Sequence, residues 1–186
     1  MAKLNEFMRF FEDSMLERIC LSQGELAKYA RGERFVREGQ ICRYVGVIQE
    51  GYFKFCSLSS AGDECVTGFS FAGELVTDYP RSFANLRPSF GSIIAGCDAT
   101  VFRMPLKKLR QLLIDSNPKL LSEYSAVLLE EAYRRYIDMH IMSPSERYAA
   151  LLERFPALAS ELPVGEVASY LGISRRHLHR IREGKC

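Results

Sequence analysis

The chain has 186 residues, of which 47% are apolar and 26% charged, and its formal net charge is +2 at pH 7. A chain of this length and composition can bury one sizeable core or two small ones, so we expect a globular protein rather than a disordered tail. Its longest apolar runs, such as 44–48 and 126–129, are far shorter than the ~20 residues that a membrane helix needs. We therefore expect a cytoplasmic protein without a membrane segment.

The chemistry-bearing residues exclude the common enzyme and metal classes. The six cysteines include no Cys-x-x-Cys pair, a spacing that fits neither a zinc ribbon nor a compact disulfide framework. All three histidines, at 140, 177 and 179, lie beyond the glycine-rich part of the chain. The sequence also lacks Gly-x-Ser-x-Gly, His-Glu-x-x-His and a phosphate loop. We expect no catalytic residue, no metal site and no cofactor.

Glycine marks the first folded region. Nine of the 13 glycines fall between positions 32 and 96, where short apolar runs alternate with turn residues. The clearest predicted strands are Tyr44–Ile48, Tyr52–Cys56, Cys65–Phe69, Ser92–Ala95 and Ala99–Met104, with a hairpin turn at Ser59–Gly62. Helical patterns flank them at Met8–Leu21 and Pro105–Ser116. We predict a β domain with flanking helices over residues 1–116.

A longer helical pattern follows at Lys119–Met142 and would extend about 36 Å, more than a small domain needs for itself. We predict that it is a dimerisation helix over residues 117–142. Charged residues interrupt its apolar stripe, so a regular heptad seam is not predicted. The predicted dimerisation residues are those of the stripe: Leu121, Tyr124, Leu128 and Ala132.

The last segment, 143–186, has the pattern of a helix-turn-helix. Ser143 to Glu146 form a capping box that begins a new helix. Two shorter helices are then predicted on either side of Gly172, the second beginning at the N-cap Ser174 and reaching Glu183. Ala168 supplies the small residue that is needed where the two helices touch.

The positive charge of the chain is concentrated in the same place. Residues 172–186 hold five Lys and Arg against one acidic residue, Glu183. Such a cluster is typical of an element that binds DNA phosphates, whereas the alternative is a helical hairpin with a solvated basic end. The predicted DNA-binding residues are Ser174, Arg175, Arg176, His179 and Arg180.

Three segments carry a resemblance to a known family. The stretches 32–39, 47–54 and 71–75 resemble the β-roll of the Crp/Fnr regulators, and the order of parts agrees with that family. The resemblance implies an α+β, two-domain fold: an N-terminal double-stranded β-roll, which is jelly-roll-like, a long dimerisation helix and an all-α helix-turn-helix domain. It also implies double-stranded DNA, a second copy of the chain and RNA polymerase as partners.

Two departures from the family pattern limit what can be carried over. Members that bind cyclic nucleotide have an Arg-Ser pair whose Arg holds the phosphate, whereas Ser89 and Phe90 stand here. Arg81 or Arg87 could substitute, but we do not expect cyclic nucleotide control, and the effector is unknown. The candidate effector pocket comprises Gly73, Glu74, Leu75, Arg81, Arg87 and Ser89. The expected second departure is the lack of a full wing after the recognition helix.

We therefore predict a sequence-specific DNA-binding transcription regulator that acts as a homodimer. The alternative is a β-roll sensor that acts through protein contacts and has lost DNA binding. A further hypothesis concerns Cys56 and Cys65, which are placed symmetrically about the hairpin turn. If they lie opposite one another they could form a redox switch, although two small apolar side chains in a sheet core is the commoner arrangement.

Overall fold

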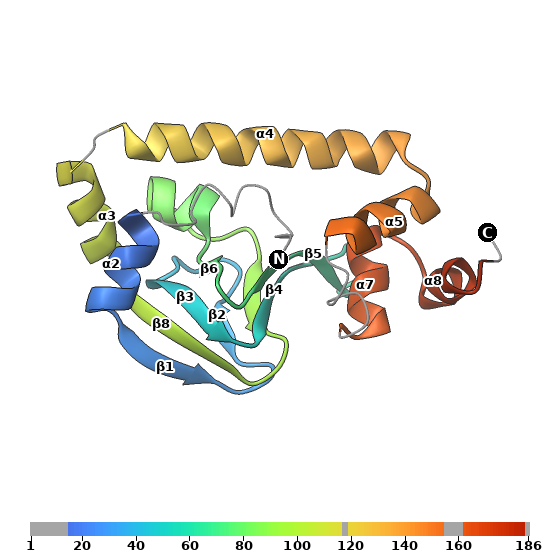
Figure 1. The fold of residues 1–186 in the computed structure, drawn as a ribbon, viewed down its shortest axis with the longest axis horizontal. Helices are drawn as coiled ribbons and strands as arrows, with labels where there is room; N and C mark the ends of the chain where they lie inside the picture. The colour runs from blue at the N-terminus through green and yellow to red at the C-terminus, as the bar shows by residue number, and fades with distance from the viewer. Residues whose placement is uncertain (1–14, 117–118, 155–161, 185–186) are drawn as a thin grey trace.

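The computed structural model describes residues 15–116, 119–154 and 162–184 (Figure 1). Within these ranges, two four-stranded antiparallel sheets form a β-roll. The first sheet has the order β1-β8-β3-β6 and comprises Glu25–Tyr29 (β1), Ala99–Pro105 (β8), Tyr44–Glu50 (β3) and Leu75–Val76 (β6). The second has the order β2-β7-β4-β5 and comprises Arg34–Val36 (β2), Ser92–Ala95 (β7), Tyr52–Leu58 (β4) and Glu64–Phe71 (β5).

The core of the roll is formed by the apolar side chains that point inward from both sheets. Ile48, Phe53 and Val101 are completely buried. Two helices, α2 (Met15–Gln23) and α3 (Leu106–Ser116), cover one end of the roll. They contribute the buried side chains Leu16, Cys20, Leu109 and Leu113. Because these buried side chains belong to the same cluster as those of the two sheets, the roll and its two helices share one hydrophobic core.

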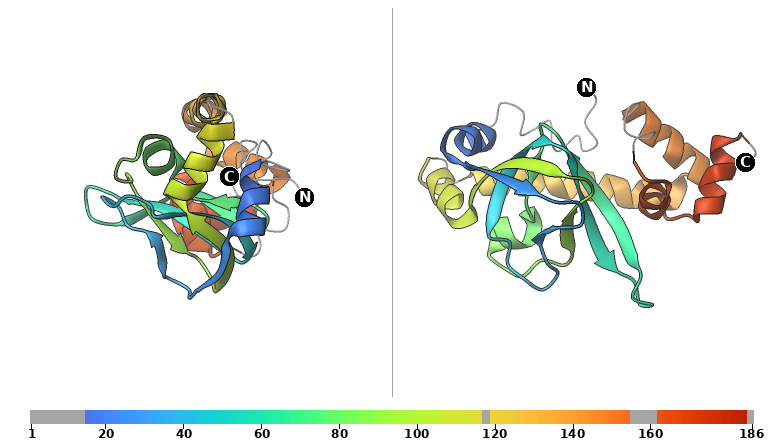
Figure 2. Two further views of the ribbon diagram at one scale, coloured as in Figure 1. Left: turned by 90° about the vertical axis from the view of Figure 1, so that its left-hand side faces the viewer. Right: turned by 90° about the horizontal axis from the view of Figure 1, so that it is seen from below.

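The long helix α4 (Leu120–Ile141) runs along the roll and connects it to a group of helices at the other end (Figures 1 and 2). That group comprises α5 (Pro144–Arg154), α7 (Val164–Leu171) and α8 (Arg175–Arg182). The predicted boundary near residues 142 and 143 coincides with the end of α4. There the Ser143 amide donates to Glu146 Oε2 at 2.7 Å, and the Glu146 amide donates to Ser143 Oγ at 3.3 Å. The capping box predicted from the sequence is therefore confirmed.

The five predicted strands are all present, but three strands and one helix were not predicted. Strand β1 exposes most of its side chains and buries only Tyr29, while β6 has two residues. The unpredicted helix is a π-helical turn, η1 (Tyr79–Phe83). It begins at Asp78, whose carboxylate accepts hydrogen bonds from the Ser82 amide and hydroxyl at 2.9 and 2.6 Å. Of the predicted first helix, residues 8–14 lie outside the described ranges.

Candidate nucleic-acid interface and effector pocket

Helices α7 and α8 form the predicted helix-turn-helix. Helix α7 ends at Gly172, which adopts a left-handed conformation with φ 69° that a residue with a Cβ enters only at a cost. Ser174 then caps α8, because its Oγ accepts a hydrogen bond of 3.2 Å from the His177 amide. Ala168, at the contact between the helices, and Leu178, on α8, are buried. The turn, the cap and the small contact residue are those predicted from the sequence.

The outer face of α8 is cationic. All of the residues proposed to contact DNA lie at exposed positions of this helix or its cap: Ser174, Arg175, Arg176, His179 and Arg180. The Arg175 side chain packs against α7 at Gly165. A Cβ added at Gly165 would lie only 2.9 Å from the Arg175 Nε atom, so the lack of a side chain there makes room for the arginine. Arg182 differs, because its Nε donates to the Tyr148 hydroxyl at 3.0 Å and so helps to hold α8 on α5. The face can therefore present positive charge without disturbing the core of the domain.

Helix α7 docks directly on the β-roll, which the sequence did not predict. The Val66 amide of β5 donates to Ser169 Oγ at 2.8 Å. The Tyr52 hydroxyl of β4 donates to Glu166 Oε2 at 2.9 Å, and Lys54 Nζ lies 3.2 Å from Glu166 Oε1. Burial and the neighbouring Glu166 carboxylate raise the pKa of Tyr52. These polar contacts surround an apolar cluster that both domains share.

Lys54 also forms an ion pair within the roll, at 2.7 Å from Glu64 Oε1. Burial alone would lower the pKa of Lys54, but hydrogen bonding to Glu64 and the charge of Glu166 raise it. The same hydrogen bond holds the pKa of Glu64 below its ordinary value. One ammonium group thus serves two carboxylates, one on β5 and the other on α7.

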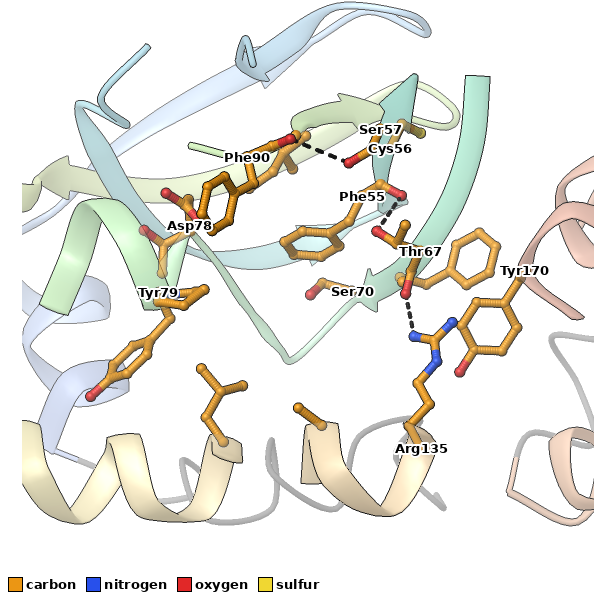
Figure 3. A pocket seen from close by; sticks show the side chains of 18 of the residues that line it. Phe55, Cys56, Ser57, Thr67, Ser70, Asp78, Tyr79, Phe90, Arg135 and Tyr170 are labelled. Carbon is orange, nitrogen blue, oxygen red and sulfur yellow. Dashed lines mark hydrogen bonds between the residues drawn. The ribbon is translucent and has the colours of Figure 1, made fainter. Parts of the chain in front are cut away.

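A cavity of about 1100 Å³ lies beneath α4, between the β-roll and the helix-turn-helix. Its walls come from β4, β5, η1 and α4 and, at the far end, from α5 and α7 (Figure 3). Aromatic side chains are prominent in it, among them Phe55, Tyr79, Phe90 and Tyr170. A cavity of this size and position could hold a small molecule in contact with both domains.

Two arginines stand at the helix-turn-helix end of the cavity. The guanidinium of Arg135, on α4, lies 4.1 Å from the centre of the Tyr170 ring and donates a hydrogen bond to the Thr67 carbonyl. Arg147, on α5, donates to the carbonyls of Met139 and Met142 at 3.3 and 2.8 Å, and to that of Leu171 at 3.1 Å. Its buried Nε atom has no hydrogen-bond partner within the described residues.

Arg135 is one of the charged residues that interrupt the apolar stripe predicted for the long helix. Arg147 has no role predicted from the sequence. A cation within a helical stripe that faces its own domain is the signal that could have indicated a pocket residue.

The residues proposed for the effector pocket divide into two groups. Leu75 and Ser89 line the cavity, with the Ser89 hydroxyl donating to the Gly91 carbonyl at 2.7 Å. The described lining does not include Gly73, Glu74, Arg81 or Arg87. Glu74 is buried and accepts a hydrogen bond of 2.9 Å from the Phe71 amide, so it supports the turn between β5 and β6.

The two arginines that could bind a phosphate, Arg81 and Arg87, differ in their contacts with the protein. The Nε atom of Arg81 donates to the Pro88 carbonyl at 3.0 Å, and its guanidinium lies 4.1 Å from the centre of the Phe90 ring. Arg87 is exposed. Neither guanidinium is therefore placed at the cavity wall in this structure.

The residues proposed for dimerisation do not form one exposed face. Leu128 packs against the core of the β-roll, and Ala132 lines the cavity. The side chains of Leu121 and Tyr124 lie outside what the structure describes. The large apolar side chains that the described part of α4 exposes are instead Leu129 (71%), Tyr133 (63%), Tyr136 (61%), Met139 (39%) and Ile141 (73%).

The suggested pairing of Cys56 with Cys65 is wrong. Cys56 pairs across the strands with Val66, while Cys65 pairs with Ser57, so the two cysteines are in successive registers. Side chains of successive registers point to opposite faces of a sheet. Cys56 is accordingly buried and Cys65 exposed. Burial raises the pKa of the Cys56 thiol to about 12, which disfavours the reactive thiolate.

Comparison with known proteins gives one family match, over the β-roll, and a set of solved structures with a similar fold. Residues 26–116 match the family model of the cyclic nucleotide-binding domain. A search of curated proteins found no match. Among solved structures, the chain is similar to FixK2 from Bradyrhizobium japonicum, at 16% identity and a TM-score of 0.75, covering 87% of this chain and 83% of that one.

Two further solved structures are similar over most of their length. The c-di-GMP responsive global regulator CLP of Xanthomonas campestris has 15% identity and a TM-score of 0.66, with 92% of this chain and 91% of that one covered. The catabolite activator protein of Thermus thermophilus has 21% identity and a TM-score of 0.54, with 91% and 81% covered.

The comparisons confirm the fold expected from the sequence. The chain has the two-domain α+β fold of the Crp/Fnr-type transcription regulators. In the described ranges, no helix is long and apolar enough to cross a membrane. Within the same ranges, no group of three or more His, Cys, Asp or Glu residues could hold a metal ion.

Proposed function

We propose that this chain is a sequence-specific DNA-binding transcription regulator that acts in the cytoplasm as a homodimer. The observation that carries the proposal is the cationic, exposed face of α8 on an intact helix-turn-helix core. Arginine can donate two hydrogen bonds to the major-groove edge of guanine, and further cations can contact phosphates. We assign base or phosphate contacts to Arg175, Arg176 and Arg180, with Ser174 and His179 beside them.

The dimer would present two such helices to one face of DNA. The exposed side chains of Leu129 and Tyr133 on α4, with Tyr136 between them and the cavity that it also lines, are suited to pair with a second copy, because they recur at spacings of four and three residues. Two-fold symmetry would then place the half-sites about one helical turn apart, ~34 Å, and the operator would be an imperfect palindrome. A regulator bound there could also contact RNA polymerase.

We further propose that DNA binding does not require cyclic AMP. A cyclic phosphate needs a cation to replace its hydration. The two candidate arginines of the roll, Arg81 and Arg87, do not line the cavity, and Arg81 is engaged by Pro88 and Phe90. At the roll end of the cavity stands the buried carboxylate of Asp78, whose charge opposes a phosphate.

The test is selection of bound sequences from a random duplex library without added effector. The wild type should enrich a two-fold symmetric site, with affinity that falls steeply as salt is raised. The Arg175→Ala, Arg176→Ala double variant should lose about a hundredfold or more in affinity. Its matched control is Arg31→Ala, Arg37→Ala, which removes the same charge from exposed positions on the β-roll and should retain the wild-type site.

Three outcomes would contradict parts of the proposal. Equal losses in the two double variants would mean that the protein binds DNA through net charge alone. Failure to enrich any sequence would favour a sensor that acts through protein contacts. Enrichment only when cyclic AMP is added would overturn the proposed independence from that nucleotide.

A further inference from the structure

The cavity beneath α4 carries an inference about the effector that builds on the proposed function. We propose that it binds a small molecule with an apolar body and a single carboxylate, and that Arg135 holds the carboxylate. Three observations support this assignment: the character of the lining, the distribution of charge along it, and the bonding of Arg135.

The roll end of the cavity is suited to an apolar body. Phe55, Tyr79, Phe83 and Leu128 line it together with the exposed ring of Phe90. The volume of about 1100 Å³ lies just above the range of roughly 300–1,000 Å³ that ligand pockets usually have. A ligand with an alkyl or aromatic body would remove these side chains from water, which is the main source of affinity in such pockets.

Charge distinguishes the two ends. The charged group at the roll end is Asp78, and it is already bonded to the amide and hydroxyl of Ser82. The cations among the described lining residues, Arg135 and Arg147, both stand at the helix-turn-helix end, where the carboxylates of Asp138 and Glu153 also line the cavity. A carboxylate is therefore opposed at the roll end, where the described lining holds Asp78 and no cation, and can be paired at the other end, where Arg135 stands. A ligand that satisfies both conditions is apolar along its length and negative at one terminus.

Arg135 is the better placed of the two cations to hold that terminus. Arg147 donates to three backbone carbonyls and is thereby committed to the protein. Arg135 donates one hydrogen bond, to Thr67, and makes no other within residues 15–116, 119–154 and 162–184. A guanidinium has several N–H donors in a planar fork, so Arg135 can keep Thr67 and still accept a carboxylate in a bidentate pair.

The occupied cavity would act on the DNA-binding domain through direct contact. Tyr170 lies under the Arg135 guanidinium, and Leu151 of α5 lines the same end. A ligand at this position touches side chains of the β-roll, α4 and the helix-turn-helix together. The affinity of the ligand must then depend on the position of the helix-turn-helix relative to the β-roll. By thermodynamic linkage, the bound ligand favours the position in which it binds more tightly.

The test measures ligand binding to the full chain in the absence of DNA. The fluorescence of 1-anilinonaphthalene-8-sulfonate, which rises when the dye moves from water into an apolar site, can report occupancy of the cavity. Dodecanoate, below the concentration at which it forms micelles, should displace the dye. Dodecanol, which has the same body without the charge, should bind at least tenfold more weakly. Cyclic AMP should not displace the dye.

Three variants test the assignment to Arg135 and to the cavity. Arg135→Gln should weaken dodecanoate tenfold or more and leave dodecanol unchanged, since a hydrogen bond to a charged group is lost. Arg134→Gln is the matched control, because Arg134 is the adjacent residue, pairs with Glu130 and does not line the cavity. Ala132→Phe should weaken dodecanoate and dodecanol alike by filling the cavity. Circular dichroism and melting temperature establish that each variant is folded.

Each contrary result overturns a defined part of the inference. Equal affinity for dodecanoate and dodecanol, or equal losses in Arg134→Gln and Arg135→Gln, would exclude carboxylate recognition by Arg135. Unchanged dye displacement in Ala132→Phe would place binding outside the cavity. Displacement by cyclic AMP would assign the cavity to a nucleotide. Because no DNA is present, these results are independent of the sequence-selection experiment, and failure of one proposal leaves the other standing.

Discussion

The phenol of Tyr52 donates a hydrogen bond of 2.9 Å to the carboxylate of Glu166, and these two residues belong to different domains. Tyr52 begins strand β4 of the roll, and Glu166 lies in the first turn of α7. The placement of the DNA-binding domain therefore depends on contacts with the roll as well as on the connection between α4 and α5. Breaking these contacts should change how firmly α7 is held.

Replacing Tyr52 with Phe removes this bond and leaves the ring. We expect the free energy of opening α7 away from the roll to fall by roughly 1–3 kcal/mol, since the acceptor is charged. Amide hydrogen exchange should accordingly become faster at Val66 and across α7. Tyr29→Phe is the control, because the Tyr29 hydroxyl bonds to Arg103 within the first sheet. Equal effects of the two substitutions on α7 would show that the Tyr52–Glu166 bond does not hold the domains together.

The ion pair between Glu64 and Lys54 predicts a pH dependence. The pKa of Glu64 is lowered in the folded protein, so its ionised form stabilises the fold at pH values above its ordinary pKa of 4.5. That stabilisation is lost as the pH falls through the lowered value. The difference in melting temperature between wild type and Glu64→Gln should therefore be largest near neutral pH and diminish in acid. A difference that is independent of pH would mean that the charge of Glu64 contributes nothing.

The exposed face of α4 predicts which substitutions should break the proposed dimer. Leu129→Asp and Tyr133→Asp place charges on that face and should yield monomers in sedimentation equilibrium, with little change in monomer stability. Leu128→Ala should do the reverse, because Leu128 packs on the core of the roll; we expect a loss of about 1–3 kcal/mol in stability and an intact dimer. Monomers formed by Leu128→Ala alone would instead support the stripe first predicted from the sequence.

The turn at Gly172 predicts a sharp dependence on residue type. Gly172→Ala should destabilise the helix-turn-helix by about 1–2 kcal/mol, because φ is 69° and the new Cβ would lie 3.2 Å from the Met139 Cε atom. Gly172→Asn should cost less, since asparagine tolerates this conformation better. Thermal unfolding followed by circular dichroism measures both. Equal stability of the alanine and glycine proteins would show that the turn relaxes to another geometry.

The helix-turn-helix could be predicted because its signals are local. Gly172 and Ser174 are two residues apart, and each determines the backbone in its own neighbourhood. The five longer strands were predicted for the same reason, since each has its own apolar run. Strands β1 and β6 were missed because one is mostly exposed and the other has two residues, so neither shows a pattern of period two.

The interface between the domains could not be predicted in this way. Tyr52 and Glu166 are 114 positions apart, and Val66 and Ser169 are 103 apart. Helix α4 posed a different difficulty, because it carries apolar residues on more than one face. Leu128 packs on the roll while the adjacent Leu129 is exposed, and a stripe read from spacing alone does not distinguish the two roles.

Arg147 stiffens the connection between α4 and α5 through its hydrogen bonds. One guanidinium holds the last turn of α4, through Met139 and Met142, and also holds Leu171 at the end of α7. Rotation at residues 142 and 143 would separate Arg147 from the carbonyls of Met139 and Met142, while its bond to Leu171 lies wholly beyond that point and would remain. The connection between α4 and α5 is therefore held by hydrogen bonds as well as by the backbone, so a rotation of α4 should also displace α8.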